Sequence, residues 1–111
     1  MAKRKTGDRI TEAVNRIKRM EKSLDKVLEA VSQLENITDA AASQECLSAI
    51  EKDVAKLRKY YEGKHWKADF ELDEKGLLPE GLKRGVLSED GIYNALDRYE
   101  ELLDEQDTDE D

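Results

Sequence analysis

The sequence predicts an all-α protein: an antiparallel helical hairpin with heptad seams, an ordered irregular loop and a third, C-terminal helix, packed as a helical bundle. Charged residues make up 41% of the 111 residues and hydrophobic residues 38%, which suits helices with one apolar stripe and charged outer faces. Only six Gly and one Pro are present, and two long segments repeat apolar residues at a helical spacing. A chain of this length is expected to form a single domain, residues 1–111.

The first helix is predicted over residues 8–36. Its apolar residues alternate steps of three and four through four heptads, which is typical of a helix whose apolar seam faces a partner helix. The seam residues are Ile10, Ala13, Ile17, Met20, Leu24, Val27, Val31 and Leu34.

The second helix is predicted over residues 39–63, with Thr38 or Asp39 as its N-cap and Gly63 as its C-cap. The short connection between the two helices predicts an antiparallel hairpin. The second seam continues the same spacing through Ser43, Leu47, Ile50, Val54, Leu57 and Tyr61.

Residues 64–87 are predicted to be an ordered, irregular loop. Three Gly and the Pro fall within ten residues, and helical periodicity is lost, but apolar residues persist. Loops of this length that carry their own packing are uncommon and often functional.

The third helix is predicted over residues 88–104, with Ser88 as the N-cap. Residues 105–111 are expected to be an acidic, disordered tail. The apolar face of this helix is expected to contain Ile92, Ala95 or Leu96, Tyr99 and Leu103.

The net charge of −8 is unevenly distributed along the chain. Residues 1–36 carry a small positive excess, whereas residues 64–111 hold most of the acidic residues. This balance disfavours direct binding of nucleic acid and permits a basic partner or mimicry of nucleic acid. With one cysteine, no signal peptide and no apolar run of about 20 residues, we expect no disulfide, no membrane span and a cytoplasmic location.

Metal binding and catalysis have little support in the sequence. The alternating acids of residues 69–73 resemble a calcium loop, but Glu74 stands where that loop needs Gly. His65 and Cys46 are the only His and Cys, and no phosphate-binding Gly motif is present. We therefore expect no metal, no cofactor and no catalytic residue.

The candidate site is an interaction surface around the loop and the start of the third helix. Four of the six aromatic residues fall in residues 60–70, and such residues either form recognition surfaces or close a core. A basic pair and a Gly then precede the third helix, where Arg84 is expected to pair with an acid at 69, 89 or 90. The candidate binding residues are Tyr60, Trp66, Asp69, Arg84 and Glu89.

These residues also carry a resemblance to a small bacterial family known as the domain of unknown function DUF4298. The resemblance covers about residues 57–97 and implies a short intracellular protein with helices and this ordered loop. It implies no activity. The residues that carry it are Tyr60, Tyr61, Trp66, Asp69, Asp73, Gly76, Pro79, Leu82, the run from Arg84 to Asp90, Ile92 and Tyr93.

The sequence favours a non-catalytic protein-interaction module, which binds another protein or a second copy of itself. One alternative is an acidic nucleic-acid mimic that inhibits a basic nucleic-acid-binding enzyme. A second alternative is a small-molecule-binding or enzymatic domain centred on the loop, in which His65, Asp69 and Arg84 would converge.

Overall fold

The computed structural model describes residues 6–88 and 90–107, and within them the secondary structure is helical, with no strand. The predicted all-α class is therefore confirmed. The elements are α1 (Thr6–Leu34), α2 (Ala40–Ala49), α3 (Glu51–Glu62), α4 (Lys64–Glu74), a short 3-10 helix η1 (Gly85–Leu87) and α5 (Gly91–Asp107).

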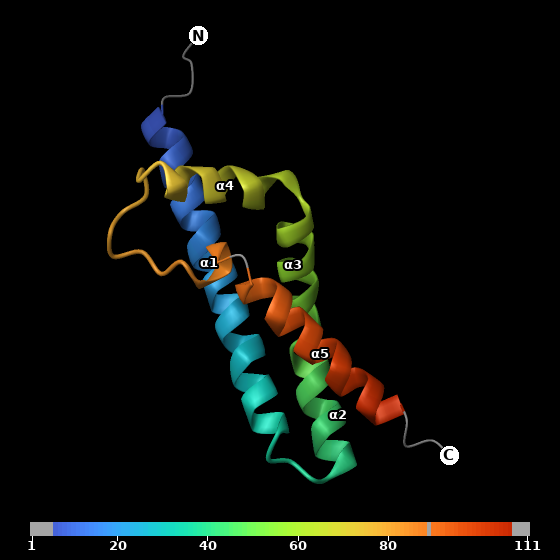
Figure 1. Ribbon diagram of the computed structural model, residues 1–111. Coiled ribbons are helices and arrows are strands. Elements are labelled where there is room, and N and C mark those ends of the chain that lie inside the picture. The colour runs from blue at the N-terminus through green and yellow to red at the C-terminus, as the bar shows by residue number, and fades with distance from the viewer. Residues whose placement is uncertain (1–5, 89, 108–111) are drawn as a thin grey trace.

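The helices form an elongated bundle (Figure 1). Helix α1 runs along most of its length, and α2 and α3 return beside it in the opposite direction. Helix α4 turns across the end of this pair, and α5 crosses over α1 and α3 on one side. The core therefore lies between α1, α3, α5 and η1.

The heptad pattern of α1 corresponds to its buried stripe. Ile10 and Met20 are half-buried against the core. Removing this stripe from water is the main favourable contribution to packing the helix, at about 25 cal/mol per Å² of apolar area. The buried seam residues are Ala13, Ile17, Leu24, Val27, Val31 and Leu34.

The segment expected as one helix over 39–63 is divided at Ile50. Asp39 caps α2 as predicted, because its Oδ2 accepts a hydrogen bond of 3.2 Å from the Ala42 N–H. Ile50 leaves the helical geometry with φ −106° and ψ 7°, but its side chain stays buried. The seam spacing continues through the break, so periodicity alone did not reveal it.

The prediction of an irregular loop over 64–87 is wrong for its first eleven residues, which form α4. Gly63 ends α3 in an extended conformation, and the chain turns into the new helix. The fully buried side chain of α4 is the polar Asp69, flanked by half-buried Trp66, Phe70 and Leu72. Because the buried position of α4 is occupied by the carboxylate of Asp69, the sequence shows no regular spacing of apolar residues there.

The junction before α5 is tightly constructed. Ser88, predicted as the N-cap, lies before the helix, which begins at Gly91, and it is instead the C-cap of η1; its Oγ accepts a hydrogen bond of 3.1 Å from the Gly91 N–H. A β-carbon at residue 91 would collide with the carbonyl oxygen of Gly85 in η1, so the close approach requires glycine there. Helix α5 begins at Gly91 and extends to Asp107, past the predicted end at 104; residues 108–111 of the expected tail lie outside the described residues. Leu103 is half-buried, while Leu102 is buried with Ile92, Ala95 and Tyr99.

Candidate functional site

A buried polar network joins α1, α3 and α4. Asp69 is fully buried, and its Oδ2 accepts hydrogen bonds from the Tyr60 hydroxyl at 2.8 Å and from Arg16 Nε at 2.9 Å. Its Oδ1 accepts a second bond from Arg16, from Nη2 at 2.5 Å. This two-pronged arginine contact satisfies both carboxylate oxygens in the interior, which is the condition for burying a charge.

The network fixes the ionisation of its donors. Burial and the hydrogen bond to Asp69 raise the pKa of Tyr60 far above its ordinary value, so the phenol stays neutral. The hydrogen bond to Asp69 likewise raises the pKa of Arg16. Tyr60 and Asp69, both predicted as surface binding residues, are therefore internal structural residues.

The raised pKa of Tyr60 predicts an alkaline loss of stability. Unfolded tyrosine ionises at about pH 10, whereas folded Tyr60 remains protonated there, so the free energy of unfolding should fall above that pH. Above about pH 10, the free energy of unfolding of the wild type should fall by up to about 1.4 kcal/mol per pH unit more than that of Tyr60→Phe. Urea denaturation of both proteins across this pH range measures the difference. Parallel curves would contradict the assignment.

Both backbone polar groups of Val86 form hydrogen bonds with side chains of other helices. Its carbonyl oxygen accepts a hydrogen bond of 2.7 Å from the Trp66 indole N–H, and its own N–H donates to Glu21 Oε2 at 2.8 Å. Glu21 is only 6% exposed. Trp66 therefore attaches η1 to α4, and Glu21 attaches it to α1.

Arg84 is also occupied within the chain. Its Nε lies 2.8 Å from Asp73 Oδ1, and its Nη2 donates a hydrogen bond of 2.7 Å to the Pro79 carbonyl oxygen. Among the residues that the structure describes, Arg84 thus pairs with Asp73 rather than with Asp69 or Asp90, two of its expected partners. Glu89, the fifth candidate, lies outside the described residues.

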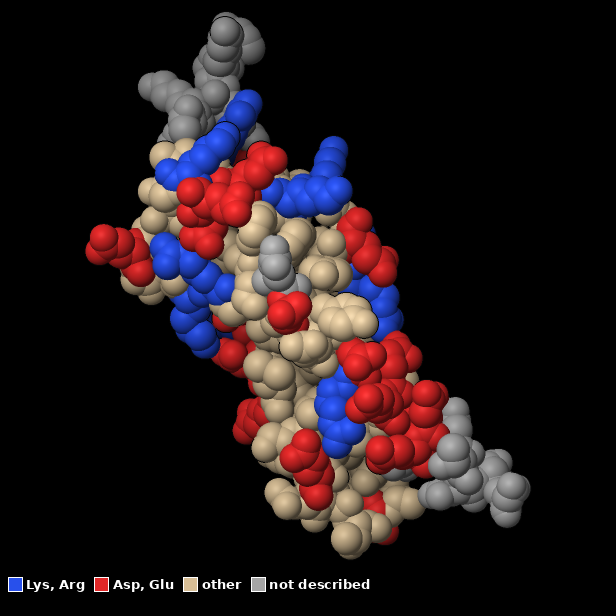
Figure 2. All heavy atoms as spheres, in the orientation of Figure 1, with Lys and Arg blue, Asp and Glu red and all other residues tan. Residues whose placement is uncertain are grey.

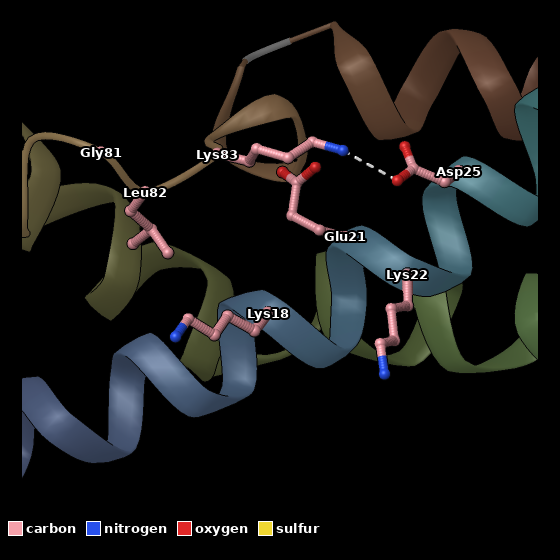
Figure 3. A pocket seen from close by; sticks show the side chains of 7 residues that line it. All are labelled: Lys18, Glu21, Lys22, Asp25, Gly81, Leu82 and Lys83. Carbon is pink, nitrogen blue, oxygen red and sulfur yellow. Dashed lines mark hydrogen bonds and ion pairs between the residues drawn. The ribbon is translucent and has the colours of Figure 1, made fainter.

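The segment before η1 is anchored over α1, as Figure 3 shows. Lys83 reaches Asp25 with an ion pair of 2.8 Å, and the Leu82 side chain points toward α1. The hollow between them has a volume of about 370 Å³ and includes the buried Glu21. Glu21 points toward η1 and is used there.

The convergence of His65, Asp69 and Arg84 that an enzymatic site would need is not present. His65 and Asp69 line a hollow of about 290 Å³ beside α1, but Arg84 does not line it. Among residues 6–88 and 90–107, no group of three or more His, Cys, Asp or Glu side chains is placed to hold a metal ion.

Three aromatic side chains are in ring contact at the surface and a fourth lines a hollow beside them, and we call Tyr61, Trp66, Phe70 and Tyr93 the aromatic row. The Tyr61 ring meets Trp66 edge-on with centroids 5.2 Å apart, and Trp66 stacks on Phe70 at 5.1 Å. Tyr93 of α5 shares a hollow of about 340 Å³ with Tyr61 of α3 and is 56% exposed. The other three rings are half-buried.

Residues 17–107 match the family described as Domain of unknown function (DUF4298). The chain belongs to this family. The match exceeds the resemblance expected for residues 57–97 and includes most of the first hairpin, from residue 17 onward. No curated protein and no solved structure matches the chain.

The structure also gives roles to the residues by which this DUF4298 chain resembled its family. Tyr60 and Asp69 bond to each other, Trp66 bonds to η1, and Asp73 pairs with Arg84. These residues hold the loop and α4 onto the hairpin. The part of the chain described by the structure contains no helix with the length and apolar character of a membrane span.

Tyr61 and Tyr93 are not among the predicted binding residues of this DUF4298 protein. Tyr61, predicted for the seam, is half-buried and packs against the core, whereas Tyr60, predicted for the surface, is buried because Asp69 of α4 offers it an acceptor. A signal for Tyr93 was available: it lies off the apolar face formed by Ile92, Ala95 and Tyr99, as an exposed aromatic residue would.

Proposed function

We propose that this DUF4298 chain is a protein-interaction module that binds its partner through the aromatic row and the adjoining acidic side of α5. The observation that carries the proposal is the exposed Tyr93 beside three half-buried aromatic rings, on a chain that is otherwise highly charged. Tyr and Trp are enriched among the residues that contribute most to protein interfaces. They also offer a large apolar area with a polar tip.

The charges beside the aromatic row indicate the chemistry of the partner. Glu62, Asp97 and Glu100 line the same hollow as Tyr61 and Tyr93. In the view of Figure 2, uncharged surface occupies the middle of the molecule and acidic residues gather over the C-terminal half of α5. Arg58 neutralises part of this charge through an ion pair of 2.6 Å with Glu100. A partner surface with one apolar and one or two basic side chains would be complementary.

The proposal includes no catalytic step. The ionisable side chains at the centre of the molecule are used in internal bonds, as for Asp69 with Arg16 and Tyr60. Their physical role is to hold α4 and η1 so that the aromatic row stands rigid. A rigid row loses little conformational entropy on binding, which favours recognition.

Tyr93→Ala should reduce partner binding by about 30-fold or more, because truncating an interface hot spot costs about 2 kcal/mol or more. Affinity capture with the tagged chain from its native cells identifies the partner, and titration calorimetry with the purified partner measures the change. Leu77→Ala is the matched control, since Leu77 is an exposed apolar side chain outside the row, with 43% exposure.

Equal binding by the wild type and Tyr93→Ala, or an equal loss in both variants, would contradict the proposal. Light scattering on the same samples separates a second copy of the chain from a different protein. A dimer that Tyr93→Ala dissociates would make the second copy the partner.

The acid-rich end of α5 supports a second candidate, an acidic mimic of nucleic acid. Exposed carboxylates of Asp97, Glu101 and Asp104 follow one another along this helix. Binding of this kind should weaken strongly as salt is raised, whereas an aromatic interface should keep most of its affinity. Repeating the titration at low and high salt distinguishes the two.

A further inference from the structure

A basic groove runs between α1 and α3, although the chain as a whole is acidic. Two adjoining hollows make it up, with volumes of about 390 Å³ and 330 Å³. Arg19, Met20 and Lys56 line both, so the hollows are continuous. No residue of α5 or of the aromatic row lines either hollow. We define the basic groove by its cations, which are Arg19, Lys22, Lys26, Lys56, Lys59 and Lys64.

The cations of the basic groove are not neutralised within the described chain. Over residues 6–88 and 90–107, none of the six forms an ion pair. The carboxylate that lines the groove, Asp53, is 8% exposed and accepts a hydrogen bond of 2.9 Å from Ser23 Oγ. Arg16, at one end, is already paired with Asp69.

Other cations of this protein do pair with acids. Lys83 pairs with Asp25 and Arg84 with Asp73, each at 2.8 Å. The groove is different because its six cations, from α1, α3 and the first residue of α4, face one another, and the carboxylate among them, Asp53, is buried and bonded to Ser23. The mutual repulsion of the cations is relieved when an anionic group enters.

The floor of the groove adds an apolar requirement. Met20 is half-buried and lines both hollows, between cations of α1 and cations of α3. Methionine adapts its shape to an apolar group placed on it. From Arg19 to Lys26 the cations extend about 10 Å along α1, at 1.5 Å per residue, which is nearly two helical turns.

We propose that the basic groove binds a short acidic segment of a partner protein, in the form of an amphipathic helix. Carboxylates on the flanks of that helix would meet the lysines and Arg19, and an apolar side chain would rest on Met20. This is the helix-in-groove mode of recognition. The proposal concerns a surface separate from the aromatic row and does not depend on the function proposed above.

A polypeptide fits this groove better than nucleic acid. Single-stranded nucleic acid is bound by basic surfaces that also present exposed aromatic rings for stacking. The aromatic groups that line the hollows are His65 and Tyr60, and Tyr60 is only 6% exposed. The acidic remainder of the molecule would also repel a long polyanion more than a short segment.

Fluorescence anisotropy at low salt tests the proposal with two labelled probes. One probe is a synthetic peptide of about five helical turns in which Leu recurs every three or four positions and Glu fills the rest. The other is a single-stranded DNA of similar charge. The groove variant is Lys56→Glu/Lys59→Glu, and the matched control is Lys67→Glu/Lys75→Glu, two exposed lysines of the α4 region that change the net charge equally.

The expected result is that the peptide binds the wild type and the control alike, and that the groove variant loses about tenfold or more in affinity. No binding of the peptide, or an equal loss in groove variant and control, would overturn the proposal. Tighter binding of the DNA than of the peptide, lost in the groove variant, would also overturn it and assign the groove to nucleic acid. Circular dichroism checks folding, and Arg19→Glu/Lys22→Glu provides a second groove variant.

Discussion

Asp69→Ala is expected to lower the free energy of unfolding by about 3–5 kcal/mol, which is the usual cost of removing one member of a buried ion pair. The substitution leaves the Arg16 guanidinium, with 20% of its side chain exposed, without its carboxylate, and it leaves the Tyr60 hydroxyl without its acceptor. Domains of this size have a total stability of about 5–15 kcal/mol. The variant should therefore lose a large part of its stability and unfold at a much lower urea concentration than the wild type, as urea denaturation followed by circular dichroism would show.

Asp73→Ala provides the matched control on the same helix. Asp73 also pairs with an arginine, Arg84, but both side chains are about a third exposed. Solvent-exposed ion pairs contribute only about 0–1 kcal/mol. Equal losses of unfolding free energy in the two variants would show that burial does not distinguish Asp69. That result would contradict the role of the network in connecting α1, α3 and α4.

Trp66→Ala is expected to cost about 3 kcal/mol, near the low end for truncating a large aromatic side chain because Trp66 is half-buried. The change removes the stacking with Phe70, the edge contact with Tyr61 and the hydrogen bond to Val86. Since Trp66 is the only tryptophan, unfolding should be followed by circular dichroism.

Trp66→Phe separates the ring from the hydrogen bond. It keeps an aromatic ring between Tyr61 and Phe70 but cannot donate to the Val86 carbonyl, so the expected loss is about 1 kcal/mol. Hydrogen exchange of the amides of η1 should be faster in both variants. Unchanged exchange at Val86 and Leu87 would contradict the role of Trp66 in holding η1 to α4.

Much of the secondary structure could be predicted from the sequence because it depends on short-range interactions. The helical period of α1 is visible in apolar residues that recur three and four positions apart. Six of its eight predicted seam residues are buried. The N-cap of α2 was equally local, since Asp39 accepts a hydrogen bond from the backbone N–H three residues later. Such features need no knowledge of the rest of the fold.

Helix α4 and the candidate site could not be predicted in the same way. The interior position of α4 is occupied by Asp69, whose burial makes sense only when Arg16 and Tyr60 approach from other helices. From sequence, an acid beside aromatic residues indicated a surface. The sequence also could not show which of Tyr60 and Tyr61 is the buried residue. They lie three and four residues after Leu57, and both spacings are compatible with the seam.

The sequence by itself determined the fold class, the long first helix, the N-cap of α2 and the family resemblance. The tertiary structure alone decided which polar residues are internal and where the surface charges gather. The basic groove illustrates the difference. Its cations lie in residues 19–26 and 56–64, and the overall charge of −8 gives no indication that they form a basic surface. They act together only because packing places α1 beside α3, and Coulomb interactions depend on distance in space rather than along the chain.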